Sequence, residues 1–177
     1  MSVKKWVADP AHSEIQFKVK HLMISTVTGY FKDFKVLVET PAEDFSQASI
    51  EFEAQTASVD TKMPDRDAHL RGEDFFDSEK YPVMRFSSKE MKRLSQDKFT
   101  LTGELIIKDV SQTVSLDVEY GGIMKDPWGN DKAGFSLSGK ISRKEWGLNW
   151  NAALETGGVL VSDEVKIFAE IQLSMAG

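Results

Sequence analysis

An alternation of apolar and polar residues with a period of two constrains this chain more than any other feature. The segment EIQFKVKH, residues 14–21, places Phe17, Val19 and His21 on one face and charged or amide side chains on the other. Successive side chains of a β-strand point to opposite sides, so this pattern predicts a strand with one buried face. The pattern recurs, and we expect eight strands, or more if residues 1–9 add another. The eight segments are residues 14–21, 34–38, 49–55, 82–88, 98–108, 113–120, 133–142 and 164–173.

Turn-forming residues separate these segments, as expected for antiparallel strands. The turn segments are ETPAED (39–44), LSQD (94–97), KDVSQ (108–112), DPWGND (126–131) and ETGG (155–158). One helix candidate, DRDAHLRGEDFF (65–76), has Asp65 or Asp67 as its N-cap, and Gly72 weakens it. We therefore expect one or two short helices in an all-β chain.

Long antiparallel strands joined by short turns predict a sandwich or a barrel. Closing a barrel removes exposed strand edges, and 177 residues suit one domain that spans 1–177. At about eight strands, a barrel interior is either filled with side chains or holds one small ligand. Small residues on the inward faces, Ala54, Gly103, Gly139 and Ala169, leave both outcomes open. They either create an apolar void or make room for large neighbours in a solid core, and periodicity alone favours the solid core.

The composition excludes several classes of function. The chain has no cysteine, so disulfides, thiolate catalysis and cysteine-ligated zinc are excluded. Its net charge of −6 repels phosphate backbones, so we expect no nucleic-acid partner and at most a transient membrane contact. The N-terminus lacks the apolar stretch of a signal peptide, which predicts a cytoplasmic protein, or a periplasmic one if a leader was removed.

The residues that could carry chemistry give a weak signal. His12, His21 and His69 show no metal-binding spacing, so we expect no metal site and no cofactor. The carboxylates between residues 65 and 79 alternate with basic residues, which is typical of a solvated, paired surface. Pairing of Arg66 with Asp67, or of Arg71 with Asp74, would lock this segment. We therefore predict no catalytic residue.

The aromatic residues Trp146 and Trp150 are more informative. They would share a face on a strand together with Leu148, and they would also share a face on a helix. Either arrangement makes a large apolar surface, for which a plug in the core is the favoured interpretation.

Four blocks of the chain resemble the YceI-like family, and together they run from about Trp6 to Leu173. The chain departs from the family pattern at three positions. Glycine is commoner at the positions of Asp109 and Ser162, and phenylalanine is commoner at the position of Trp146. The bulk of Trp146 is expected to shorten or reshape a cavity. The resembling blocks are DPAHSEIQFKVKHLMISTVTGYF, ASVDTKMPDRDAHLRGEDFFDSEKYPVMRFSS, GELIIKDVSQTVSLDV and DPWGNDKAGFSLSGKISRKEWGLNWNAALETGGVLVSDEVKI.

The resemblance implies an antiparallel, eight-stranded, lipocalin-like β-barrel with a long apolar cavity. It also implies binding of a long-chain isoprenoid lipid, such as a polyprenyl quinone precursor, or a similar amphiphile, with no enzymatic activity and a possible homodimer. The polar head of the ligand would lie near His21 or His69, and residues 65–82 would cap the barrel. The expected ligand-binding residues are Phe17, Val19, His21, Phe31, Phe52, His69, Phe75, Phe86, Leu101, Leu116, Phe135, Trp146 and Trp150.

Two alternatives remain beside the carrier. One is an enzyme that acts on an amphiphilic isoprenoid substrate through His21 or His69 and a carboxylate. The other is a stress-response or interaction protein with a solid core.

Overall fold

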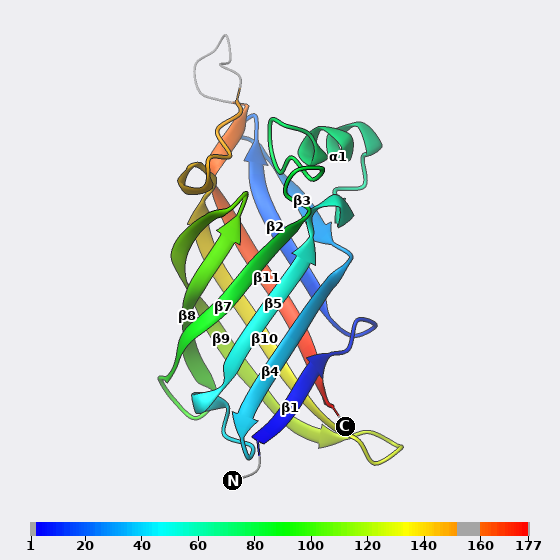
Figure 1. Ribbon diagram of the computed structural model, residues 1–177, viewed down its shortest axis with the longest axis vertical. Helices are drawn as coiled ribbons and strands as arrows, with labels where there is room; N and C mark the ends of the chain where they lie inside the picture. Colours follow the sequence, from blue (N-terminus) through cyan, green and yellow to red (C-terminus); the bar gives the residue numbers. More distant parts are fainter. Residues whose placement is uncertain (1–2, 152–159, 177) are drawn as a thin grey trace.

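The predicted strands are present in the computed structural model, which describes residues 3–151 and 160–176 (Figure 1). Several strands extend beyond their predicted limits. β7 and β9 continue past a β-bulge, at Ser88–Glu90 and at Tyr120–Gly122, where an extra residue breaks the alternation. The strands are β1 (Val3–Ala8), β2 (Glu14–His21), β3 (Ser25–Phe31), β4 (Phe34–Pro41), β5 (Ser49–Gln55), β6 (Val59–Asp60), β7 (Val83–Arg93), β8 (Lys98–Ile107), β9 (Val110–Lys125), β10 (Asp131–Ser142) and β11 (Val161–Met175).

These segments form one antiparallel β-barrel. The hydrogen-bonded order runs β1-β4-β5-β7-β8-β9-β10-β11, and β11 pairs with β1, with Trp6 opposite Met175. The remaining segments continue three of these strands: β2 follows β1 alongside β11, β3 precedes β4, and β6 follows β5. The described residues thus make an eight-stranded closed barrel in which three strands are interrupted. The prediction of an eight-stranded antiparallel barrel is confirmed.

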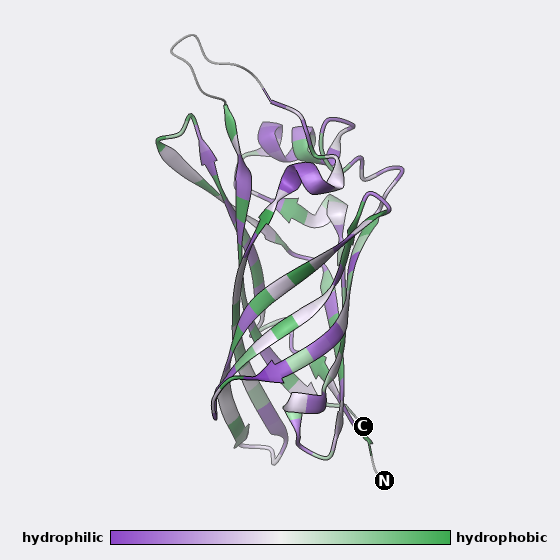
Figure 2. Ribbon diagram, turned by 90° about the vertical axis from the view of Figure 1, so that its left-hand side faces the viewer, coloured by the Kyte–Doolittle hydropathy of each residue, from purple (hydrophilic) through white to green (hydrophobic). Residues whose placement is uncertain are grey.

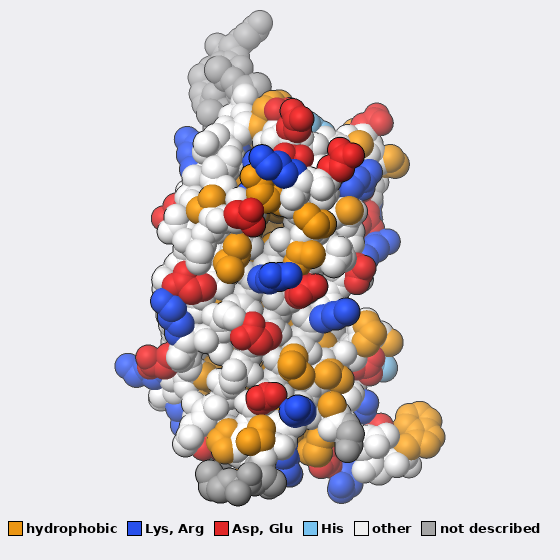
Figure 3. All heavy atoms as spheres, viewed as in Figure 1, with side chains coloured by type: hydrophobic (Ala, Val, Ile, Leu, Met, Phe, Trp, Pro, Cys, Tyr) orange, Lys and Arg blue, Asp and Glu red, His pale blue; other side chains and the backbone are white. Residues whose placement is uncertain are grey.

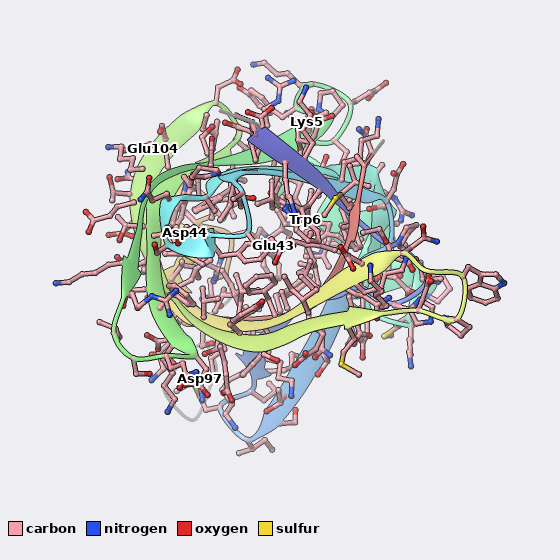
Figure 4. All side chains as sticks on the ribbon, turned by 90° about the horizontal axis from the view of Figure 1, so that it is seen from below. Lys5, Trp6, Glu43, Asp44, Asp97 and Glu104 are labelled. Carbon is pink, nitrogen blue, oxygen red and sulfur yellow. The ribbon has the colours of Figure 1, made fainter. Side chains whose placement is uncertain are left out.

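The two ends of the barrel differ. Hydrophilic and hydrophobic positions alternate along the strands (Figure 2), and acidic and basic side chains are dispersed over the outer wall (Figure 3). The lower end is closed by a short 3-10 helix, η1 (Phe45–Gln47), which inserts Phe45 against Trp6 and Phe135. Figure 4 looks into this end, where Trp6 points into the barrel. The floor is therefore an aromatic core.

The upper end carries the helix α1 (Pro64–Arg71), which is shorter than the predicted 65–76. The predicted N-cap is wrong. Met63 occupies the cap position without a side-chain hydrogen bond, and Pro64 opens the helix, where its missing N–H costs nothing. The carboxylate of Asp67 points back to Thr61 instead. Two further 3-10 helices, η2 (Thr56–Ser58) and η3 (Arg143–Trp146), lie at this end.

The turns follow the expected positions with two corrections. The predicted turn over 39–44 begins too early, because β4 continues to Pro41. The turn between β8 and β9 uses Lys108 and Asp109, both with positive φ, and β9 begins at Val110, so the predicted turn over 108–112 is too long. The predicted turn at 155–158 lies outside the described residues. Within residues 3–151 and 160–176, no helix is long and apolar enough to cross a membrane.

Candidate ligand-binding site

The upper half of the barrel contains a cavity of about 560 Å³. Its wall comes from inward-facing residues of the strands, and α1 with the segment after it lies over its upper end. Its lining includes the exposed residues Met63 and Asp65 at the α1 end, so the cavity reaches the surface there, at what we call the mouth. Most of the predicted ligand-binding residues are in the lining. These are Phe17, Val19, His21, Phe31, Phe52, His69, Phe75, Phe86, Leu101, Leu116 and Trp150.

Two predicted residues lie elsewhere among the described residues. Phe135 is packed in the floor, with ring centroids 4.9 Å from Phe45 and 5.1 Å from Tyr120. Trp146 is 1% exposed, and its indole N–H donates to the Leu105 carbonyl at 2.8 Å. Trp146 is therefore a plug in the core beside the cavity, rather than a part of its wall.

The segment with both tryptophans is neither a strand nor a regular helix. After η3 the chain reverses at Gly147, whose φ of 79° is the left-handed conformation that glycine adopts without strain. The reversal separates the two indoles. Trp150 lies at the mouth, 4.6 Å from the His69 ring and 5.5 Å from Phe75.

The inward glycines do not create the cavity. A Cβ at Gly103 would collide with the Phe86 ring and the Ser87 carbonyl, and one at Gly139 would collide with Leu116. Both glycines therefore make room for large neighbouring side chains, as the solid-core interpretation expects. The interior is nevertheless not filled, because these neighbours, Phe86 and Leu116, line the cavity.

The wall and the mouth differ in chemistry. Along the strands the lining is aliphatic and aromatic, whereas most of its polar groups lie toward the α1 end. The polar lining residues are Gln16, Lys20, His21, Thr61, Asp65, Arg66, His69 and Arg143. An apolar pocket with a few convergent polar groups is the usual form of a small-molecule site.

Thr61 fixes the segment that caps the mouth. Asp67 is buried and accepts hydrogen bonds from the Thr61 N–H at 2.8 Å and from its hydroxyl. Arg66 donates to the Thr61 hydroxyl at 2.8 Å and to its carbonyl at 2.9 Å. The expected Arg66–Asp67 pair is thus wrong, because both side chains are directed at Thr61 and tie α1 to the end of β6.

The second expected pair is also replaced. The Asp74 carboxylate lies 2.8 Å from His69 Nε2 and so pairs with His69 instead of Arg71. The His69 ring packs edge-on against Phe75 and Trp150. The imidazole therefore joins the capping segment to the loop after η3.

Arg143 is a buried cation at the mouth that the sequence pattern does not reveal. It is 4% exposed, and its guanidinium donates to the carbonyls of Leu148, Trp150 and Ser162. Burial lowers the pKa of Arg143 from its ordinary value, and the Asp163 carboxylate opposes that shift. A basic residue in the polar stretch SRKE gives no sign of burial, so no periodic pattern could have found it.

The histidines do not converge on one site. His12 lies in the loop between β1 and β2, where Nδ1 is 2.9 Å from Asp9, whereas His21 and His69 line the cavity. Across the described part of the chain, no group of three or more histidine and acidic residues is placed to hold a metal ion.

Comparisons with known proteins agree on one family. A family model described as the YceI-like domain matches residues 6–173. A UPF0312 protein of Staphylococcus epidermidis is 40% identical over 172 residues, which cover 97% of this chain and 98% of the relative. The crystal structure of a Campylobacter jejuni YCEI protein is 34% identical with a TM-score of 0.78, over 96% of each chain. A polyisoprenoid binding domain from Saccharophagus degradans has the same fold, at 13% identity and a TM-score of 0.68, over 97% of this chain and 98% of that domain.

Proposed function

The chain belongs to the YceI-like family, and from this premise we propose that it binds a long-chain isoprenoid lipid, or a similar amphiphile, and carries it in its barrel. The observation that carries the proposal is the cavity of about 560 Å³, which lies within the range of about 300–1,000 Å³ for small-molecule sites. The polyisoprenoid-binding function named for the Saccharophagus degradans domain supports the choice of ligand class.

The two chemistries of the cavity suit the two parts of such a ligand. Transfer of an apolar chain from water to the aliphatic wall is favourable by about 25 cal/mol per Å² buried, less the cost of ordering the chain. A polar head would remain near His21, Arg66 or His69, where donors and water are within reach. A polyprenyl quinone precursor meets these requirements. Homodimer formation, transient membrane contact and a cytoplasmic location remain predictions.

Of the alternatives, the solid-core protein fits least, because the interior is hollow. The enzyme alternative rests on the His69–Asp74 pair at the mouth. It requires turnover of a bound isoprenoid that is lost in His69→Gln, whereas a carrier releases the same molecule that it bound.

The first experiment is mass spectrometry of the purified protein, in the native state and after extraction with organic solvent. A stoichiometric lipid with several isoprene units is the expected result. A different amphiphile would keep the cavity as the binding site and contradict the isoprenoid class. A protein with no bound mass is then titrated with a prenyl quinone, and failure to bind it would overturn the proposal.

A further inference from the structure

A ring of five aliphatic residues narrows the barrel at one level. Each residue lines the cavity above and also a second, smaller void of about 60 Å³ below. The five come from five different strands, so they form one layer of the interior. We call this layer the waist, and it comprises Val36, Ile50, Leu101, Leu137 and Ile171.

The lower void is closed from below by two aromatic rings. Phe45 and Phe135 line it, both are buried, and their ring centroids lie 4.9 Å apart. Beneath them Trp6 is fully buried and donates to the Thr40 hydroxyl at 3.2 Å. The described residues thus divide the interior into a cavity, a waist one side chain thick, a small void and an aromatic floor.

We propose that the waist sets the length of the chain that this protein binds, with Leu137 as a length-determining residue. This inference rests on the proposed function, and it concerns where the inner end of the bound chain stops. A chain entering from the mouth meets aliphatic wall until it reaches the waist. Packed interiors resist the insertion of even one methylene group, so a longer chain must leave its outer end in water.

Leu137 suits a test because Leu116 provides a matched control. Leu137 on β10 and Leu116 on β9 are both half-buried and both line the cavity, but Leu116 borders only the upper side. Leu137→Ala opens the waist toward the lower void, whereas Leu116→Ala widens the cavity without deepening it.

The experiment measures the affinity of each variant for linear prenyl alcohols that increase by one isoprene unit. The wild type is expected to show one preferred length. Leu137→Ala should shift this optimum to a longer alcohol, with an affinity for it about tenfold higher than that of the wild type, because two more methylene-sized groups are buried. Leu116→Ala should weaken all lengths and leave the optimum unchanged.

Two further variants provide a reversal control and a substitute for Leu137→Ala. Ala48 lines only the lower void, so Ala48→Leu should cancel the shift when added to Leu137→Ala. If Leu137→Ala does not fold, Val36→Leu narrows the waist and should shorten the preferred length. An unchanged optimum in folded Leu137→Ala, or an equal shift in Leu116→Ala, overturns the inference. A wild type that binds no prenyl alcohol contradicts the proposed function instead.

Discussion

Phe52 shows how a single position decides between wall and surface. It lines the cavity, whereas the preceding residue, Glu51, is exposed on the outer face of the same strand. The pleat of β5 therefore places two adjacent side chains in opposite environments.

A lysine at either position gives a matched pair. Phe52→Lys should abolish ligand retention, because a bound chain would bury the ammonium group among aliphatic side chains, and burial of an unpaired charge costs much free energy. Glu51→Lys should retain the ligand. Mass spectrometry of both purified variants checks this, and a folded Phe52→Lys protein that still carries lipid would count against the site.

Arg143 stabilises the mouth through the carbonyls that it satisfies. Arg143→Met should reduce the free energy of unfolding by about 2–4 kcal/mol, because several buried acceptors lose their donor. Lys144→Met is the control, since Lys144 is exposed and contacts the same Asp163 at 3.2 Å. Urea unfolding measures both, and equal effects would show that the buried bonds are not the cause.

Glu104 on the outer wall gives a prediction on pH. Hydrogen bonds from Lys89 first, and then from Ser111 and Thr113, lower the pKa of Glu104 from 4.5 to about 2. A depressed pKa in the folded state favours folding above pH 4.5, and this contribution is lost as the pH falls toward 2. The free energy of unfolding of Glu104→Gln should therefore be lower than that of the wild type at neutral pH, and the two values should converge in acid. A pH-independent difference would refute the assignment.

Among the elements, α1 depends on a tertiary contact rather than on its own sequence. It is one short helix without a capping side chain, and helices of this length are marginal in isolation. The hydrogen bonds from Thr61 to the buried Asp67 hold it over the mouth.

Loss of this contact should loosen α1 as a unit. Asp67→Ala is expected to destabilise the protein by about 1–3 kcal/mol and to speed hydrogen exchange across Pro64–Arg71. Asp65→Ala removes another carboxylate of the same first turn, but an exposed one, and should change neither quantity much. Hydrogen-exchange mass spectrometry compares the two, and slow exchange in Asp67→Ala would contradict the role of the contact.

The strands show what alternation can and cannot predict. Segments with an unbroken period of two, such as β2 and β5, are found at their predicted limits. Alternation does not reveal β3, because its central inward position is Gly29, which has no side chain to mark the pattern and is covered by the Phe17 ring. Alternation fixes the face of a residue but not its depth. Phe135 therefore faces inward as predicted, yet it lies in the floor.

At the scale of the whole molecule, the hollow interior links ligand binding to stability. A ligand that binds only the folded state, at a free concentration of a hundred times its Kd, adds about 2.7 kcal/mol to the free energy of unfolding. For a chain of this size, that raises Tm by roughly 5–10 °C. Thermal unfolding with and without prenyl alcohol measures the shift, and Phe52→Lys should show none. An equal shift in that variant would place binding outside the cavity.

The two described ends of the chain lie side by side at the floor (Figure 1). The N–H of Ala176 donates to the Lys5 carbonyl at 2.7 Å, whereas the cavity opens at the opposite end of the barrel. A protein attached to a sensor surface or a bead through either end would therefore stand with its opening toward the solution. Attachment through either end therefore suits immobilised binding assays in which all molecules have the same orientation.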